Sequence, residues 1–138
     1  MTTSGPTPAA SSVSELRLVV TAADWDAAVA LYRDALGLSQ VADFSGEQGR
    51  VILLEAGRAT IEVMDADQAA YVDDLEVGRR VTPALRVALR VPDADATTRR
   101  LAEAGAEVVA DATATPWGSR NARLDTPPLH LTVFDGGD

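Results

Sequence analysis

The sequence predicts an α+β fold of two similar βαβββ modules, with a cleft between the free faces of their half-sheets. The first indication is an internal repeat, in which residues 16–28 align without a gap with residues 85–97. The second is that each half shows a strand pattern, an aspartate at a helix start and a helix pattern, in that order. The third is the length of 138 residues, which suits one domain with a real core. Such a repeat usually means two units packed around a shared surface.

Composition divides the chain into a tail and one domain. Residues 1–13 are rich in Ser, Thr, Pro, Gly and Ala without a hydrophobic period, which predicts a disordered tail. The single domain is then expected over residues 14–138. Within it we expect module one at about 14–65, an acidic connection over 66–82 and module two at about 83–136.

In the first module, alternation of polar and apolar residues predicts a strand over 15–22. Asp24 is a good N-cap for a helix that runs to about Leu36, and Gly37 suits the position after its end. Trp25, at the start of this helix, is expected in the core. Two further strands are expected in a hairpin, over residues 50–55 and 59–64.

The connection is acidic and polar, and we expect it to be solvated, with at most one short helix. Its acidic residues are Asp65, Asp67, Asp73, Asp74 and Glu76. The second module then repeats the plan, with Asp93 capping a helix that ends near Gly105. Its strands are expected over residues 83–91, 106–110, 119–125 and 129–134.

Charge and composition exclude several classes of function. The net charge of −9 argues against a nucleic-acid partner, which needs a basic face. The absence of Cys excludes disulfides, thiolate metal sites and a Cys nucleophile. No apolar run reaches membrane-spanning length, and residues 1–14 lack the apolar stretch of a signal peptide. We therefore expect a cytoplasmic protein without a membrane partner.

Strand alternation sorts the side chains into a helix face and a free face. In the last strand Leu129, Leu131 and Val133 suit the helix face. The other face then carries His130, Thr132 and Phe134, and the matching strand of module one carries Glu62 and Met64. The same alternation, combined with the repeat, gives four equivalent central positions on the free faces: Arg17, Glu62, Arg86 and Thr132.

Three motifs carry a family resemblance. Residues 28–38 include Tyr32 and end in Leu36-Gly37-Leu38, residues 101–108 form a matching helix end, and Pro116-Trp117-Gly118 precedes the seventh strand. With these motifs the chain resembles the vicinal oxygen chelate superfamily over roughly residues 15–135. That superfamily includes glyoxalase I, bleomycin-resistance proteins, extradiol dioxygenases and fosfomycin-resistance enzymes. The resemblance implies a glyoxalase-like fold.

The resemblance also bears on metal binding. Metalloenzymes of the superfamily hold a ligand at each of the four positions, commonly His or Gln, Glu, His and Glu. This sequence has Arg17, Glu62, Arg86 and Thr132 there, and arginine has no lone pair for a cation. Only Glu62 suits a metal, so we expect no metal and no cofactor. The metal-free, bleomycin-resistance-like members are the closer analogy.

Three hypotheses of different classes follow. The first is a metal-independent protein that binds a small molecule, such as one that sequesters a drug or natural product. The acidic chain suits a cationic ligand and the cleft arginines suit an anionic one, so the ligand's charge stays open. The expected ligand-binding residues are Arg17, Arg86, Trp117, Thr132, Met64 and Phe134.

The second hypothesis is a metal-independent lyase, isomerase or cyclase. Glu62 or His130 would be its catalytic acid or base, with Arg17 and Arg86 stabilising an oxyanion. The plainer interpretation is that His130 is a hydrogen-bonded strand residue and that Glu62 only pairs with arginine. The third hypothesis is a decayed site in a stable dimer. In each case we expect a homodimer, because two short open sheets leave faces and edges to be covered.

Overall fold

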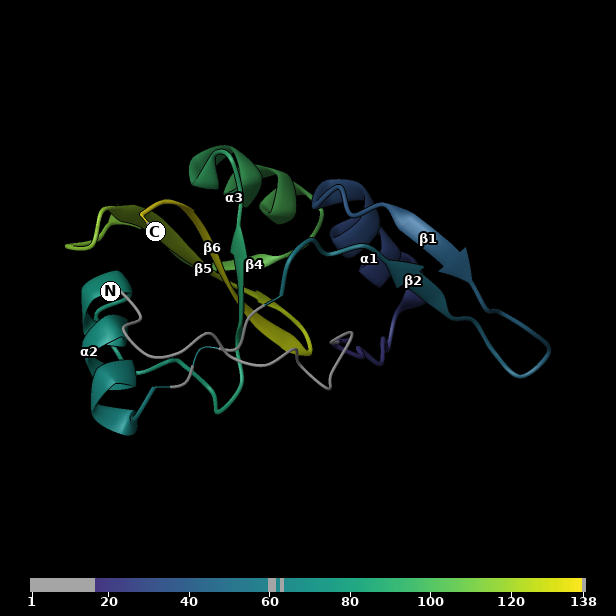
Figure 1. The fold of residues 1–138 in the computed structure, drawn as a ribbon, viewed down its shortest axis with the longest axis horizontal. Helices are drawn as coiled ribbons and strands as arrows, with labels where there is room; N and C mark the ends of the chain where they lie inside the picture. The colour runs from purple at the N-terminus through teal and green to yellow at the C-terminus, as the bar shows by residue number, and fades with distance from the viewer. Residues whose placement is uncertain (1–16, 60–61, 63, 138) are drawn as a thin grey trace, which may run out of the picture.

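The computed structural model describes residues 17–59, 62 and 64–137 (Figure 1). The expected tail over residues 1–13 lies outside this part of the chain, and the division into modules stays a prediction. The structure is mixed α+β with two separate sheets, as predicted. Within the described residues, no helix combines the length and apolar character needed to cross a membrane.

The second half of the chain forms the complete βαβββ unit that was expected. Its elements are β3 (Val87–Arg90), α3 (Ala94–Glu103), β4 (Glu107–Ala114), β5 (Ser119–Thr126) and β6 (Leu129–Gly136). They build a four-stranded sheet in the order β3-β6-β5-β4, in which β3 runs parallel to β6 and the other pairs are antiparallel. Asp93 caps α3 as predicted, accepting a hydrogen bond from the Ala96 amide at 3.0 Å.

The helix of the first half also begins where the sequence predicts. The Asp24 carboxylate accepts a hydrogen bond from the Ala27 amide at 3.1 Å and caps α1 (Trp25–Val29). The helix continues as a wider π-helical turn, η1 (Ala30–Ala35), and Gly37 follows it with a φ of +79°. Glycine is the residue that adopts this left-handed conformation without strain.

The strands of the first half differ from the prediction. Residues 17–22 form no strand, and half of the strand expected over 59–64 falls outside the described residues. β2 (Ile52–Leu54) lies within the strand expected over residues 50–55, but its partner is β1 (Gln40–Asp43), with which it forms an antiparallel two-stranded sheet. This hairpin projects from the rest of the molecule (Figure 1). β1 was not predicted because its four residues contain only two apolar side chains and show no extended alternation of polar and apolar residues.

The core lies between α3 and one face of the four-stranded sheet. Its buried members are Leu31, Ala94, Leu101, Ala106, Ala122, Leu124, Leu131 and Val133. Leu31 of η1 is the member that the first half contributes. Beside it, the Tyr32 hydroxyl donates a hydrogen bond to the Thr126 carbonyl oxygen at 3.0 Å, so the first helix is docked on the second half.

The connection contains an 11-residue helix, α2 (Ala66–Glu76), whose N-cap Asp65 accepts a hydrogen bond from the Gln68 amide at 2.9 Å. Val72, Asp73 and Glu76 are its buried residues. Ala122 and Leu124 of β5 belong to the core under α3, so the alternating residues of that strand point to the opposite face. Glu76 contacts that opposite face. The expectation of a solvated connection was therefore wrong for Asp73 and Glu76.

Candidate functional site

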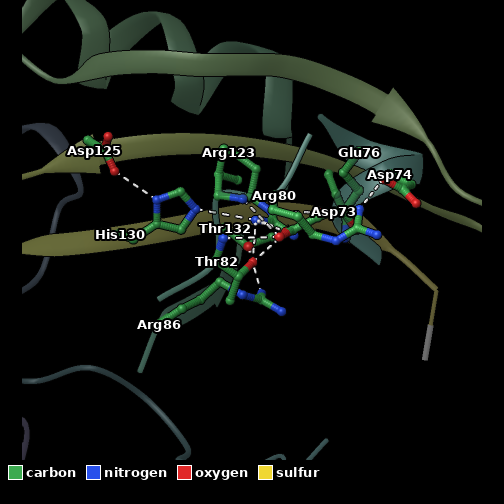
Figure 2. A network of polar contacts seen from close by, with 12 residues as sticks. Asp73, Asp74, Glu76, Arg80, Thr82, Arg86, Arg123, Asp125, His130 and Thr132 are labelled. Atoms are coloured by element: carbon green, nitrogen blue, oxygen red, sulfur yellow. Dashed lines mark hydrogen bonds and ion pairs between the residues drawn. The ribbon is translucent and has the colours of Figure 1, made fainter. Parts of the chain in front are cut away.

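A network of charged and polar side chains covers the face of the β3-β6-β5 sheet that lies opposite α3 (Figure 2). β5 contributes Asn121 and Arg123, and β6 contributes His130 and Thr132. Arg86 joins from the residue just before β3. The alternation of the strands explains this gathering, because Arg123, His130 and Thr132 each stand between two residues that pack in the core under α3.

Arg123 is the centre of the network. Its side chain is 0% exposed, and its Nε donates to Glu76 Oε1 at 2.8 Å. Its Nη1 lies 3.0 Å from Asp73 Oδ1 and donates to Thr82 Oγ1 at 2.9 Å. Asn121 Nδ2 holds the other oxygen of Glu76 at 2.8 Å. Two carboxylates of α2 are thus fixed on one buried guanidinium, which ties α2 to the sheet.

The environment of Asp73 favours its ionised form. Burial opposes ionisation, but hydrogen bonds from the Thr82 hydroxyl and from the Thr82 and Val81 amides outweigh it. The nearby Arg123 adds to their effect, and together they lower the pKa of Asp73 to about 2. Asp73 therefore stays charged at neutral pH and keeps its ion pair with Arg123.

His130 lies in a chain of contacts that fixes its tautomer. Its Nδ1 is 2.7 Å from Asp125 Oδ1, and its Nε2 is 3.3 Å from Nη1 of Arg123. Because a guanidinium can only donate, Nε2 is the acceptor and the proton sits on Nδ1, where it is donated to Asp125. With only 7% of its surface exposed, His130 is a buried, hydrogen-bonded strand residue.

Arg86 occupies the outer edge of the network, away from the sheet (Figure 2). Its Nη1 donates to Thr132 Oγ1 at 2.7 Å, which joins two residues that the repeat placed at equivalent central positions. Partial burial and the neighbouring charge of Arg123 lower the pKa of Arg86, and the more distant Glu76, Glu62 and Asp73 act in the opposite direction. The site thus holds a second guanidinium in a partly dry environment.

The remaining predicted site residues are more scattered. Arg17 and Glu62 are exposed, and Met64 is half-buried. Trp117 lies between β4 and β5 with 44% of its surface exposed. Phe134 of β6 is half-buried under the guanidinium of Arg90, which lies 4.8 Å from the ring centre. Trp25, expected in the core, is half-buried instead, and the Arg50 guanidinium lies 5.0 Å from its ring centre.

The structure therefore brings Arg86, Thr132 and His130 into one network, and it adds members that the sequence argument missed. These are Asp73, Glu76, Thr82, Asn121 and Arg123. One signal was present in the sequence: Asn121, Arg123 and Asp125 alternate with the apolar Ala122 and Leu124 along one strand. Their acidic partners come from a different element and carry no such pattern.

Two cavities are found on the described part of the molecule, and the second borders the polar network at His130. One, of about 410 Å³, is lined by residues of the first helix, Trp25 among them, and of the β1–β2 hairpin, and by none of the predicted site residues. The other, of about 340 Å³, is lined by Arg79, Arg80, Asp125 and His130, among others. Arg86 lines neither cavity. Among the residues that the structure describes, no group of three or more His, Asp or Glu side chains is placed to hold a metal ion.

Comparison with known proteins gives a family. The model of the "Glyoxalase/Bleomycin resistance protein/Dioxygenase superfamily" matches residues 16–134. No curated protein matches the chain in sequence.

Solved structures share the fold at low sequence identity. The hypothetical protein SA1046 from S. aureus is similar with a TM-score of 0.58 and 16% identity, covering 91% of this chain and 95% of its own. TnmS3, an antibiotic binding protein from Streptomyces sp. CB03234, has a TM-score of 0.57 and 24% identity, covering 93% and 100%. TioX from Micromonospora sp. ML1 has a TM-score of 0.56 and 20% identity, covering 91% and 98%.

Proposed function

Because the chain belongs to the Glyoxalase/Bleomycin resistance protein/Dioxygenase superfamily, we propose that it binds a small molecule without a metal ion, as bleomycin-resistance-type members do. The site we propose is the polar face of the β3-β6-β5 sheet around Arg86 and Thr132. Arg17, Met64, Trp117 and Phe134 are proposed as further ligand contacts.

The observation that carries the proposal is the 2.7 Å hydrogen bond from Arg86 to Thr132. By the family resemblance, both residues stand at positions where metalloenzymes of this superfamily hold a metal ligand. A guanidinium cannot coordinate a cation, and here it uses the threonine hydroxyl as its acceptor. The pair therefore supports a site built for hydrogen bonding to a ligand and not for holding a metal.

The comparisons support the class of ligand. TnmS3, which shares the fold, is described as an antibiotic binding protein. A fold hosts many chemistries, so this likeness alone does not fix a ligand. Together with the polar face around Arg86 it favours a natural product of antibiotic size over a macromolecule.

The geometry of His130 favours binding over the lyase, isomerase or cyclase hypothesis. Both of its ring nitrogens are engaged, by Asp125 and by Arg123. A general acid or base must reach a proton on the substrate, and a nitrogen that already accepts from a buried arginine is poorly placed for this. Glu62, the other proposed acid or base, is exposed.

We also propose that the protein is a homodimer and that a second copy completes the wall of the site. The β1–β2 hairpin projects from the molecule (Figure 1), and a two-stranded hairpin is marginally stable on its own in water. Val41, Phe44 and Val51 of this hairpin expose apolar surface. Light scattering at micromolar concentration is expected to give the mass of a dimer, and a monomer would contradict this part of the proposal.

The binding proposal is tested by thermal denaturation with a panel of antibiotics, in the presence and absence of a chelator. A true ligand in 100-fold excess over its Kd stabilises the folded state by about 2.7 kcal/mol. We expect saturable stabilisation that the chelator leaves unchanged. The variant Thr132→Val should weaken it, whereas Thr113→Val, at an exposed threonine of β4, should not. Binding that the chelator abolishes, or that both variants leave intact, would contradict the proposal.

A further inference from the structure

The charges of the polar network are distributed unevenly between its two arginines. Two carboxylates of α2 belong to the network, Asp73 with 2% and Glu76 with 4% of its surface exposed. Both make their ion pairs with Arg123, at 3.0 and 2.8 Å. A single buried guanidinium therefore has two negative partners.

Arg86 has no comparable partner among the described residues. Its hydrogen bond goes to the neutral hydroxyl of Thr132, and no carboxylate of the described chain lies within ion-pair distance of it. Glu62, which the sequence placed opposite it, is exposed and acts on Arg86 only through space. Within the described part of the chain, the positive charge of Arg86 is therefore not neutralised by contact with a carboxylate.

The geometry of the Arg86 side chain leaves a suitable edge for a ligand. Nη1 is the atom bonded to Thr132, and that bond holds the guanidinium in place. The opposite edge, formed by Nε and Nη2, has no acceptor among the described residues. This edge presents two parallel N–H groups, the arrangement that matches two oxygens of a carboxylate or a phosphate. Figure 2 shows Arg86 on the outer side of the network.

Burial makes this imbalance significant. A charge in a partly dry site is costly unless it is paired, and Arg123 adds repulsion to that cost. An anionic group at the Nε and Nη2 edge would relieve both effects. Arg123 cannot take this role itself, because it is fully buried and already holds two carboxylates.

We propose that the ligand carries an anionic oxygen group, a carboxylate or a phosphate, which Arg86 binds through its Nε and Nη2 edge. This inference rests on the proposed binding function and deepens it by fixing the charge of the ligand. It also resolves the opposing indications of the sequence: the net charge of −9 belongs to the chain as a whole, whereas the polar face presents an arginine without a carboxylate partner. Arg123 is a positioning residue, which holds the α2 carboxylates away from Arg86.

The test is a titration of the full-length, ¹⁵N-labelled protein followed by NMR of the arginine Nε–H groups. The probes are inorganic phosphate, benzoate and benzylammonium, with chloride at equal ionic strength as the reference. The resonance missing from Arg86→Gln identifies Arg86. We expect it to move saturably with phosphate or benzoate and not with benzylammonium, and the stronger of the two anions indicates which oxygen group the site prefers.

Variants of Arg86 and Arg90 distinguish a specific anion site at Arg86 from general electrostatic attraction of anions to surface arginines. Arg86→Gln should weaken anion binding about tenfold or more, because it removes a charge-assisted hydrogen bond. Arg86→Lys should restore part of it, since it keeps the charge and loses the paired N–H groups. The matched control is Arg90→Gln, which removes the same charge from the exposed position at the end of β3. It should change the affinity less than about twofold.

Three outcomes would overturn the inference: equal losses in Arg86→Gln and Arg90→Gln, a saturable response to benzylammonium alone, or no response to either anion. The antibiotic panel keeps this failure distinct from failure of the proposed function. If a panel compound binds at the polar face and neither anion competes with it, the ligand's charge is inferred wrongly and binding itself stands. If no compound and no anion binds, both proposals fail.

Discussion

The two halves of the molecule start from the same local signal and reach different degrees of packing. Asp24 caps α1 and Asp93 caps α3 with hydrogen bonds of 3.1 and 3.0 Å to the amide three residues ahead. α1 has no buried residue, whereas α3 buries Ala94, Thr97, Thr98 and Leu101. Capping thus places the start of a helix, and the surrounding sheet decides how much the helix contributes to stability.

The two faces of the second sheet show a similar difference. The face under α3 is closed by apolar side chains, and the face under α2 is closed by ion pairs and hydrogen bonds. Apolar contact is tolerant of small changes in geometry, whereas a buried ion pair becomes costly as soon as one partner is removed. The polar face should therefore be the more sensitive of the two to single substitutions.

The largest effect is expected at the centre of that polar face. Arg123→Met leaves Asp73 and Glu76 buried without their common partner and should lower the free energy of unfolding by about 3–5 kcal/mol. The matched control is Arg120→Met on the same strand, whose ion pair with Asp95 is exposed and whose loss should cost about 0–1 kcal/mol. Urea denaturation measures both values. Equal effects of the two changes would show that the network does not hold α2 to the sheet.

A smaller but still large effect is expected on the apolar face. Leu124→Ala removes a fully buried side chain from the core and should cost about 2–5 kcal/mol. Val41→Ala in the first half removes a side chain that is 56% exposed, and in a monomer it should cost about 0.5 kcal/mol or less. A large effect of Val41→Ala that shrinks as the protein is diluted would show instead that the hairpin is buried in a dimer.

The fold of the second half was predictable because its signals are local and agree with one another. Asp93 marks the helix start, and alternation in the last strand placed Leu131 and Val133 toward the helix and His130 and Thr132 away from it, as the structure has them. In the first half the same kind of pattern over residues 15–22 predicted a strand that the described residues 17–22 do not form. A strand needs a partner, and alternation alone does not supply one.

The candidate site was predictable only in part. Alternation and the repeat placed Arg86 and Thr132 on one face, and the structure joins them. Asp73 and Glu76 could not be assigned to that face, because their burial depends on where α2 docks. In sequence, an acidic helix that carries an ion pair is indistinguishable from one that faces solvent. Whether Arg17 and Glu62 approach the same site stays a prediction.

The contribution of Asp73 to the free energy of unfolding should depend on pH. The apolar side chains of the opposite face have no ionisable group and should show no such dependence. The pKa of Asp73 is about 2 in the folded protein, below the value of about 3.9 in an unfolded chain. The unfolded state therefore binds its proton first as the pH falls, so this residue stabilises the fold above about pH 4, and that contribution is lost as the pH falls toward 2. Thr82→Val removes a hydrogen bond to the carboxylate and should raise the lower end of this window, which is set by the pKa of Asp73 in the folded protein.

The measurement is the free energy of unfolding between pH 2 and pH 6, compared with that of Asp73→Asn. The difference between the two proteins should be constant at the upper end of this range and shrink at the lower end. A difference that stays constant down to pH 2 would mean that Asp73 is not held as an ion by Thr82 and Arg123.

The smallest effects are expected at the two helix caps, where the losses of stability in Asp93→Ala and Asp24→Ala are compared. Asp93→Ala should cost about 1 kcal/mol of global stability, because α3 is packed on the core and its first turn unfolds only with it. Asp24→Ala removes the same hydrogen bond from α1, which buries no side chain. The first turn of α1 should then fray locally, with little change in global stability. Urea denaturation should detect the first change and barely register the second, whereas amide hydrogen exchange should detect both. Equal losses of global stability would mean that the first helix belongs to the same cooperative unit as the second sheet, with Leu31 and Tyr32 as the contacts that join it.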